Sequence, residues 1–274
     1  MREVNVAIVQ TIPIVGAVEE NLERMDRRIQ SICTSSHVDL IVFPELSTTG
    51  YECGVRFNDL AERVPGHTTN YLARRASEFG IHLLFGMAQK GKMDSVIYNA
   101  AVLIGPDGEI LDVYHKAHLK GEEKLIFRPG YRYSVTETGF GTVGVMLGWD
   151  LAFPEVARTL ALQGAEMLCV PSNWESPHAG EWRAYCSARA YENSAFVVAT
   201  NRTGEEYTYA FFGDSVVIGP RGQVLSAAES ADQEQEDVCQ TIRIDLSEVQ
   251  RARKEFKLLQ SRLPRTYREV VKMY

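Results

Sequence analysis

Two short stretches of the chain repeat one pattern. Each follows an apolar run and reads I-G-P-x-G-x-x-L, first from Ile104 to Leu111 and again from Ile218 to Leu225. A Pro-x-Gly segment between two apolar runs is typical of a tight turn, so each stretch predicts a β-hairpin. Such turns are common one at a time, but here each ends a similar series of strands and helices. The repeat therefore predicts two pseudo-equivalent halves.

The spacing of apolar residues gives both halves the same plan of alternating strands and helices. The first half has predicted strands at residues 4–9, 40–43, 81–88, 98–104 and 109–114, and predicted helices at 19–33 and around 72–79. The second half has predicted strands at 142–147, 166–170, 195–200, 215–218 and 223–227, and predicted helices at 154–163 and 180–193. We therefore expect an α/β fold, with two packed sheets in the middle and helices outside.

The C-terminal part departs from this plan. Residues 227–237 are acidic and rich in Ala and Ser, which predicts a solvated loop. A final helix should follow, with one apolar face made by Val249, Ala252, Phe256 and Leu259. We expect residues 1–261 to form a single domain. The tail 262–274 is too mixed in composition to fold on itself, so it should either extend freely or dock on a neighbouring subunit.

Composition argues against several classes of protein. The formal net charge of -7 disfavours nucleic acid or an anionic membrane as a partner, and no apolar run approaches the length of a membrane span. The chain has five cysteines, an odd number without CxxC pairs, which argues against a disulfide framework or a zinc site. We therefore expect a cytoplasmic protein.

The stretch from Gly141 to Glu155 has the form of a functional site. Apolar residues from Val143 to Leu147 predict a buried strand, and Pro154 predicts the start of a helix. A sharp turn between them would expose one side chain beside the backbone N–H groups of the helix. This arrangement suits a nucleophile next to an oxyanion hole, yet the tip of the turn is Gly148, which has no side chain. By itself the stretch is equally typical of a buried strand that ends in a glycine turn.

Three charged residues lie just after predicted strands. Glu45 follows one buried strand, Lys116 follows another, and Glu123 comes a few residues later. A carboxylate buried alone costs several kcal/mol, so Glu45 must be solvated, paired or functional. Each of the three by itself is more typical of a surface charge. His115 and His118 are spaced like metal ligands, but no third ligand cluster accompanies them.

Further motifs accompany these residues in order along the chain. They are Phe43-Pro44-Glu45, Thr49-Gly50-Tyr51, Tyr98-Asn99-Ala100-Ala101, His115-Lys116-Ala117-His118-Leu119, Glu123-Lys124, Phe127-Arg128-Pro129-Gly130, Gly144 to Asp150, Phe153-Pro154-Glu155 and Arg189 to Asn193. Their order and spacing resemble the nitrilase, or carbon–nitrogen hydrolase, superfamily over essentially the whole chain. The resemblance implies a four-layer αββα sandwich of two similar halves, in agreement with the repeated hairpin.

The resemblance implies a hydrolase that acts on a small amide or nitrile without a metal or organic cofactor. Glu45 would be its general base, and Glu123 would position the substrate and support the lysine. Lys116 would stabilise the oxyanion of the tetrahedral intermediate, helped by the backbone N–H of Trp149. The superfamily usually forms dimers, so the resemblance also implies a homodimer or larger homo-oligomer, with residues 262–274 as an arm on the neighbour.

Residues at the family's pocket positions are candidates for substrate binding. They are Tyr51, Trp149, Asn173 and Trp174. Each also has a structural alternative, because the tryptophans can pack in a core and Asn173 can cap a turn. Arg183 or Arg189 would recognise a substrate carboxylate, although a structural ion pair is the more typical role for both.

The sequence departs from the family at one position. The family's nucleophilic cysteine falls on residue 148, which is glycine here, and without a thiolate no thioester forms. Cys53, Cys169 and Cys186 are not obvious substitutes, since packing is the more typical role for each.

Three hypotheses therefore stay open. The chain is a family hydrolase whose nucleophile has been replaced, so that it holds substrate without turnover. Alternatively, it is a natural, catalytically silent binding protein that keeps the pocket. In the third hypothesis, Glu45 and Lys116 perform a non-covalent hydratase or lyase reaction.

Overall fold

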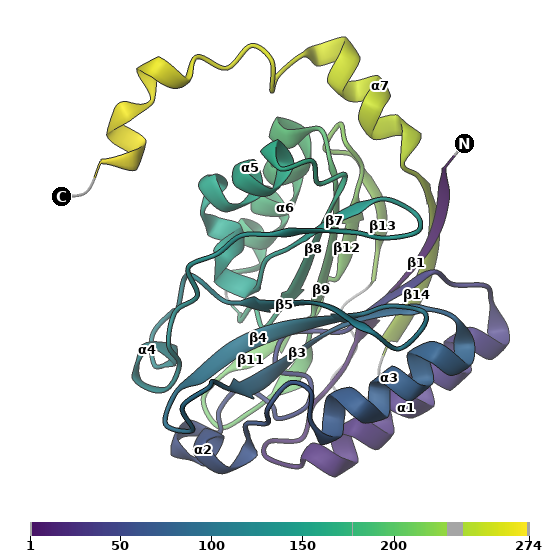
Figure 1. Ribbon diagram of the computed structural model, residues 1–274, viewed down its shortest axis with the longest axis vertical. Coiled ribbons are helices and arrows are strands. Elements are labelled where there is room, and N and C mark those ends of the chain that lie inside the picture. Colours follow the sequence, from purple (N-terminus) through teal and green to yellow (C-terminus); the bar gives the residue numbers. More distant parts are fainter. Residues whose placement is uncertain (1, 177, 229–237, 273–274) are drawn as a thin grey trace.

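Two six-stranded sheets form the centre of the molecule (Figure 1). The computed structural model describes residues 2–176, 178–228 and 238–272. The first sheet contains β1 (Glu3–Gln10), β2 (Leu40–Val42), β3 (His82–Lys90), β4 (Ile97–Ile104), β5 (Ile110–His115) and β14 (Val238–Asp245). The second contains β6 (Val135–Glu137), β7 (Thr142–Val145), β8 (Met167–Ser172), β9 (Phe196–Asn201), β12 (Val216–Ile218) and β13 (Val224–Ala227).

The two sheets have the same topology. Their strand orders are β14-β1-β2-β3-β4-β5 and, in the matching direction, β6-β7-β8-β9-β12-β13. In each sheet three parallel strands lie next to one another, an antiparallel strand pairs with the first, and an antiparallel hairpin follows the third. This correspondence confirms the two pseudo-equivalent halves.

The repeated hairpins match in detail. The register shifts between Leu103 and Ile104 in β4–β5, and between Val217 and Ile218 in β12–β13. The last glycine of each turn has a positive φ, +83° at Gly108 and +77° at Gly222. A left-handed residue followed by a bulge is what a Gly-containing turn of this length requires, which explains why both copies keep the glycine.

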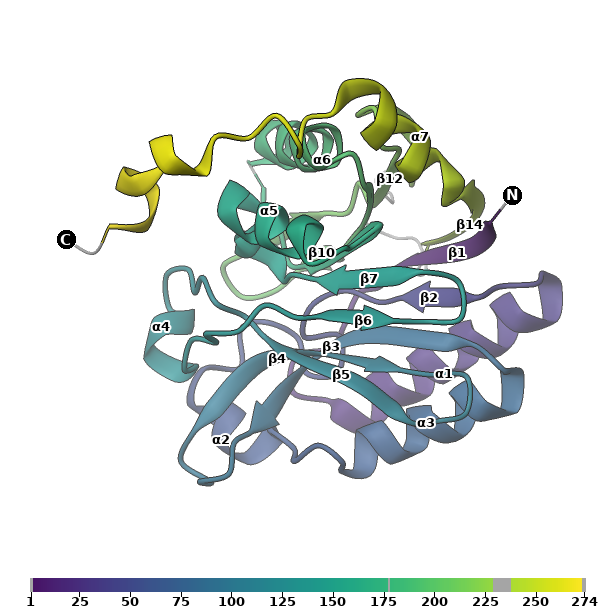
Figure 2. The same cartoon turned by 45° about the horizontal axis from the view of Figure 1, so that its top comes forward.

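Helices cover the outer face of each sheet and complete four layers (Figure 2). Helices α1 (Val18–Ser35) and α3 (His67–Phe79) pack on the first sheet, and α5 (Pro154–Leu162) and α6 (Ala179–Asn193) pack on the second. Apolar residues of both sheets, such as Val42 and Val145, form the central core between them. These layers confirm the expected αββα sandwich.

Several elements differ from the predictions. Strand β14, strand β6 and the hairpin of β10 (Thr203–Glu205) and β11 (Ala210–Phe212) were not predicted, because their apolar residues are few and mostly half-buried. Helix α7 (Ser247–Phe256) ends earlier than expected, since Lys257 is left-handed, so Leu259 does not share its face. Most of the predicted acidic loop lies outside the described residues.

The remaining helices are short. They are α2 (Phe57–Leu60), α4 (Glu123–Ile126) and 3₁₀ turns at Gly54–Arg56, Gly148–Ala152, Pro264–Thr266 and Arg268–Val271. Among the described residues no helix is long and apolar enough to span a membrane. The arrowheads of β2 and β7 point to the same end of the sandwich as α4 (Figure 2). The carboxyl ends of the parallel strands therefore meet at one end, as in other α/β sheets that bind ligands there.

Candidate active site

A buried lysine lies between two buried glutamates at this end of the sandwich. The Nζ atom of Lys116, just after β5, is 2.7 Å from Oε1 of Glu45 and 2.7 Å from Oε1 of Glu123. Glu45 is only 1% exposed, Lys116 2% and Glu123 5%. The structure thus brings together three charged residues that come from three separate segments of the sequence.

Burial and neighbouring charges both shift the pKa values of Glu45 and Lys116. Burial raises the pKa of Glu45, and the nearby charge of Glu123 raises it further, while Lys116 opposes both. Burial alone would lower the pKa of Lys116, but the two carboxylates outweigh it, so its pKa is raised. The cluster therefore combines a permanently charged lysine with a carboxylate that is more basic than an ordinary glutamate.

Further hydrogen bonds fix the carboxylate of Glu45. The side-chain amide of Asn99 donates to Oε1 at 2.6 Å, and the backbone N–H of Asn173 donates to Oε2 at 3.0 Å. The turn that carries Glu45 lies directly on β3, because Gly86 there has no Cβ to overlap with the Glu45 backbone. Asn99 belongs to one of the sequence motifs, but no role had been predicted for it.

The turn after β7 ends beside this cluster. Gly148 opens the 3₁₀ turn with φ +43°, a conformation that favours glycine. Asp150, which is fully buried, accepts hydrogen bonds from the hydroxyl of Tyr114 at 2.6 Å and from the backbone N–H groups of His118 at 2.9 Å and Leu147 at 3.1 Å. Asp150 therefore joins this turn to the segment that carries Lys116, another role that had not been predicted.

The missing side chain of Gly148 would have pointed at the charged cluster. An ideal Cβ on this residue would be 3.1 Å from Nζ of Lys116 and would overlap with Oε2 of Glu45. A nucleophile at position 148 would therefore contact both a base and a cation. In this chain the Glu45 carboxylate extends into that space.

A small cavity adjoins the cluster. Its lining residues are Glu45, Tyr51, Lys116, Lys120, Glu123, Trp149, Asn173, Trp174 and Glu175. All four residues that were predicted to bind substrate are among them. The cavity measures about 10 Å³, which is room for roughly one water molecule. Lys120 and Glu175 were not predicted, although Lys120 directly follows the motif His115–Leu119 and Glu175 directly follows the predicted pocket residue Trp174.

A hairpin at the cavity holds Tyr51 in place. The carboxylate of Glu206, between β10 and β11, accepts hydrogen bonds from the backbone N–H of Tyr51 at 2.9 Å and of Glu52 at 2.6 Å. Glu206 also forms an ion pair with Arg202, and both side chains are buried. In return, the carboxylate of Glu52 accepts from the backbone N–H of Thr208 at 2.8 Å. The hairpin and the Tyr51 loop therefore fix one another.

Other candidate residues have structural partners. The rings of His115 and His118 point to different places, because His115 stacks on Tyr98 and His118 stacks on Phe153. Among the described residues, no group of three or more His, Cys, Asp or Glu side chains is arranged to hold a metal ion. The buried thiol of Cys53 donates to the carbonyl oxygen of Thr49.

The other cysteines and arginines that were weighed as candidates also have structural roles. Cys169 and Cys186 are buried in the core, and burial raises the pKa of both thiols. Arg183 forms an ion pair with Asp214. Arg189 donates to the carbonyl oxygens of residues 151 and 152 at 2.9 and 3.1 Å, which supports the turn that begins at Gly148. Neither arginine lines the cavity.

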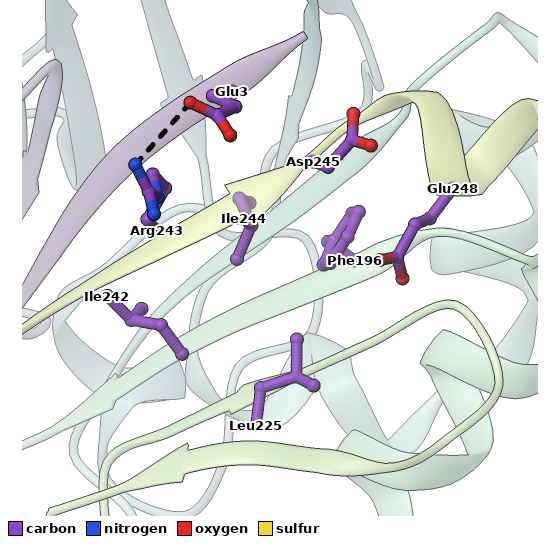
Figure 3. Close-up of a pocket in the computed structure, with 8 residues that line it drawn as sticks. All are labelled: Glu3, Phe196, Leu225, Ile242, Arg243, Ile244, Asp245 and Glu248. Carbon is purple, nitrogen blue, oxygen red and sulfur yellow. Dashed lines mark ion pairs between the residues drawn. The ribbon is translucent and has the colours of Figure 1, made fainter. Parts of the chain in front are cut away.

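A second hollow lies at the opposite end of the strands, where Glu3 begins β1 and Phe196 begins β9. It measures about 270 Å³ and is lined by Glu3, Phe196, Leu225, Ile242, Arg243, Ile244, Asp245 and Glu248. Its apolar side chains point into the space between β14 and β13, and Glu3 pairs with Arg243 at 3.6 Å (Figure 3). The residues that line this hollow include neither a nucleophile nor a buried charge cluster, so the buried cluster of Glu45, Lys116 and Glu123 belongs to the other end.

The fold and the cluster together define a class of protein. Proteins of this class are αββα sandwiches that hold a buried lysine between two glutamates at the carboxyl ends of their strands. The model of the carbon-nitrogen hydrolase family matches residues 5–254, and the chain belongs to that family.

Individual relatives agree with this assignment. A probable nitrilase of Schizosaccharomyces pombe is 38% identical over 271 residues, which cover 97% of this chain and 98% of the relative. A nitrilase of Pyrococcus abyssi is 37% identical over 235 residues, which cover 84% of this chain and 87% of the relative. The crystal structure of a carbon-nitrogen hydrolase from Helicobacter pylori G27 superposes with a TM-score of 0.91 at 25% identity, covering 99% of both chains.

Proposed function

We propose that the protein binds a small amide or nitrile in the cavity beside Glu45, Lys116 and Glu123, and that glycine at position 148 removes the covalent step of hydrolysis. The observation that carries this proposal is the direction of residue 148, whose ideal Cβ would contact both Lys116 and Glu45. The names of the relatives, which include nitrilases and an (R)-stereoselective amidase from Pseudomonas, support the substrate class.

Each residue of the site has a role in this proposal. With a cysteine at 148, Glu45 would take the thiol proton, pass it to the leaving ammonia or amine, and then activate the deacylating water. Lys116 and the backbone N–H of Trp149 would stabilise the oxyanion, and Glu123 would keep the lysine in place. No step requires a metal or an organic cofactor.

The side chain of Asn173 supports an amide as the ligand. Asn173 is 7% exposed and lines the cavity, and neither atom of its amide group has a hydrogen-bond partner among the described residues. An unpaired buried amide costs free energy unless a partner arrives. A primary amide offers both a donor and an acceptor, so it can pair with both atoms of Asn173.

Without a nucleophile the chain should turn over slowly at most. Loss of one member of a catalytic unit typically reduces kcat by several orders of magnitude, on the order of 10⁶ in serine proteases. A water in the cavity could attack directly with Glu45 as base, but neutral water is a much weaker nucleophile than a thiolate. The hypothesis of a silent binding protein and that of a very slow hydrolase therefore invoke the same site.

The Gly148→Cys variant tests the proposal. Incubated with a panel of small amides, nitriles and N-carbamoyl compounds, it should release ammonia and carry an acyl adduct on residue 148, detected by intact-mass spectrometry. The unchanged chain should form no adduct. Glu45→Gln in the Gly148→Cys background should abolish turnover, whereas Cys53→Ala should not affect it. Full activity of the unchanged chain that survives Glu45→Gln would contradict the proposal and favour a different reaction.

We further propose that the protein is a cytoplasmic homodimer or larger homo-oligomer. Residues 1–261 would form the domain, and the tail 262–274 would lie on the neighbouring subunit. Two observations support the arm: the described tail extends away from the body (Figure 1), and it exposes Leu263, Val270 and Val271 by 65%, 60% and 81%. The five unpaired cysteines are in keeping with a reducing compartment.

A further inference from the structure

Two opposite charges line the cavity without taking part in the proposed chemistry. The ammonium group of Lys120 and the carboxylate of Glu175 form an ion pair. Both residues line the same cavity as Glu45 and Lys116. Their side chains are 36% and 16% exposed, so the pair lies between the cavity and the solvent. A substrate that reaches the cluster meets these two charges.

The backbone holds both residues in fixed positions relative to the cluster. The backbone N–H of Lys120 donates to Oε2 of Glu123 at 3.0 Å, and Oε1 of the same carboxylate accepts from Lys116. On the other side, the backbone N–H of Ser176 donates to the carbonyl oxygen of Ala210 at 2.8 Å, and residue 175 forms a β-bridge with residue 211. These backbone contacts fix the attachment points of the two charged side chains beside the cluster.

The cavity leaves no room for a substrate while the pair is closed. Space for roughly one water cannot hold an amide of several carbon atoms. Once Lys120 and Glu175 part, each partly buried charge loses its partner, and an unpaired charge in such a place is costly. A ligand with a single charge restores one of the two interactions, and a neutral ligand restores neither. Only a ligand with a negative and a positive group restores both.

The net charge of the cavity disfavours a ligand whose only charge is a carboxylate. Glu45, Glu123 and Glu175 are opposed by Lys116 and Lys120, which leaves an excess of one carboxylate if all five are ionised. A ligand with a carboxylate alone would add to this excess. A zwitterion leaves the net charge unchanged while it pairs with both Lys120 and Glu175.

We propose that the site recognises the zwitterionic head group of an α-amino acid that carries a terminal side-chain amide or nitrile. The carboxylate would bind Lys120, the ammonium group would bind Glu175, and the amide or nitrile would extend to Glu45, Lys116 and the Gly148 turn. This inference rests on the proposed function, since it names the substrate class of the same site.

Four amides of similar length test the proposal. Glutamine, used as each enantiomer in turn, has both charges, glutaramate has only the carboxylate, 4-aminobutanamide has only the ammonium group, and butanamide is neutral. Calorimetric titration of the unchanged chain should give a Kd for one enantiomer of glutamine at least about tenfold below those of the other three compounds, because charge-assisted hydrogen bonds in a partly buried site are worth that much or more. Equal or tighter binding of butanamide would overturn the proposal.

Single substitutions test whether Lys120 and Glu175 recognise the ligand or only support the structure. Lys120→Met should weaken glutamine to the affinity of 4-aminobutanamide, and Glu175→Gln should weaken it to that of glutaramate. Lys124→Met is the matched control, because Lys124 is an exposed lysine of α4 that does not line the cavity. It should leave all four affinities unchanged. If Lys120→Met and Lys124→Met behave alike, the recognition role is wrong.

A charge exchange gives a readout that stability alone cannot produce. The double variant Lys120→Glu/Glu175→Lys keeps an ion pair but exchanges its two ends. Exchanging the positions of the carboxylate and the ammonium group on Cα inverts its handedness. The double variant should therefore prefer the opposite enantiomer of glutamine from the unchanged chain. An unaltered enantiomer preference would overturn the proposal.

Failure of this inference is distinguishable from failure of the proposed function. If the Gly148→Cys variant hydrolyses butanamide or simple nitriles but discriminates against glutamine, the amide or nitrile function stands and the zwitterion proposal is wrong. If that variant is stably folded and hydrolyses no amide or nitrile, the proposed function itself is wrong, and the inference falls with it.

Discussion

The carboxylate of Glu45 occupies the space into which a side chain at residue 148 would extend. An ideal Cβ on Gly148 would overlap with Oε2 of Glu45, and this same oxygen accepts a hydrogen bond from the backbone N–H of Asn173 at 3.0 Å. Glycine at 148 thus allows a packing of the charged cluster in which Glu45 is held by hydrogen bonds on both oxygens. Any larger residue at 148 must displace this carboxylate.

The first prediction concerns the stability of variants at this position. Gly148→Ala should lower the free energy of unfolding for two reasons, the left-handed backbone at φ +43° and the overlap with Glu45. The backbone contribution is about 1 kcal/mol or somewhat more. Gly80→Ala isolates that contribution, because Gly80 has φ +65° and no atom within 4 Å of its ideal Cβ. Chemical denaturation should show a larger loss for Gly148→Ala than for Gly80→Ala, and equal losses would mean that Glu45 yields without cost.

The second prediction concerns the pH dependence of the Gly148→Cys variant. In its proposed role as the base, Glu45 must be ionised, and its pKa is raised above the ordinary glutamate value by burial and by Glu123. Activity should therefore be lost as pH falls through a value above 4.5. Glu123→Gln removes one of the raising contributions, so it should move this acid limb of kcat/KM to lower pH. An acid limb at the same pH in both proteins would show that Glu45 does not control it.

The third prediction concerns the ion pair that holds the Tyr51 loop. Glu206→Gln leaves the guanidinium of Arg202 buried without its partner, since the two side chains are 1% and 0% exposed. Removing one member of a buried pair typically costs about 3–5 kcal/mol of stability. Glu255→Gln is the control, because its pair with Arg221 is exposed and should be worth about 1 kcal/mol or less. Thermal and urea unfolding of both variants would compare them, and similar losses would argue against this anchor.

The fourth prediction concerns the tail. Ending the chain after Ser261 removes residues 262–274, including the exposed apolar side chains Leu263, Val270 and Val271. If these side chains pack on a neighbouring subunit, truncation should shift the protein from dimer toward monomer in sedimentation at micromolar concentration. A monomeric intact chain at that concentration would contradict the proposed arm.

Local sequence patterns determined most of the secondary structure and the positions of the main site residues. Apolar periodicity predicted most strands and helices, because the side chains that a strand or helix buries are spaced by its own geometry. The repeated I-G-P-x-G-x-x-L turns predicted two equivalent halves, since a left-handed glycine followed by a bulge is encoded within a few residues. The ends of the predicted strands also indicated Glu45, Lys116 and Gly148.

Tertiary structure alone decided which distant segments of the chain pair with one another. Strand β14 completes the first sheet by pairing with β1, although Glu3 and its partner Asp245 are separated by nearly the whole chain. The contacts of Tyr114 with Asp150 and of Lys120 with Glu175 likewise join separate segments of the chain. Local periodicity carries no information about which distant residue will be opposite, because that pairing depends on how whole sheets and loops pack. The sequence therefore determined which residues end the strands, and only the packing of the two sheets decided which charges meet in the cavity.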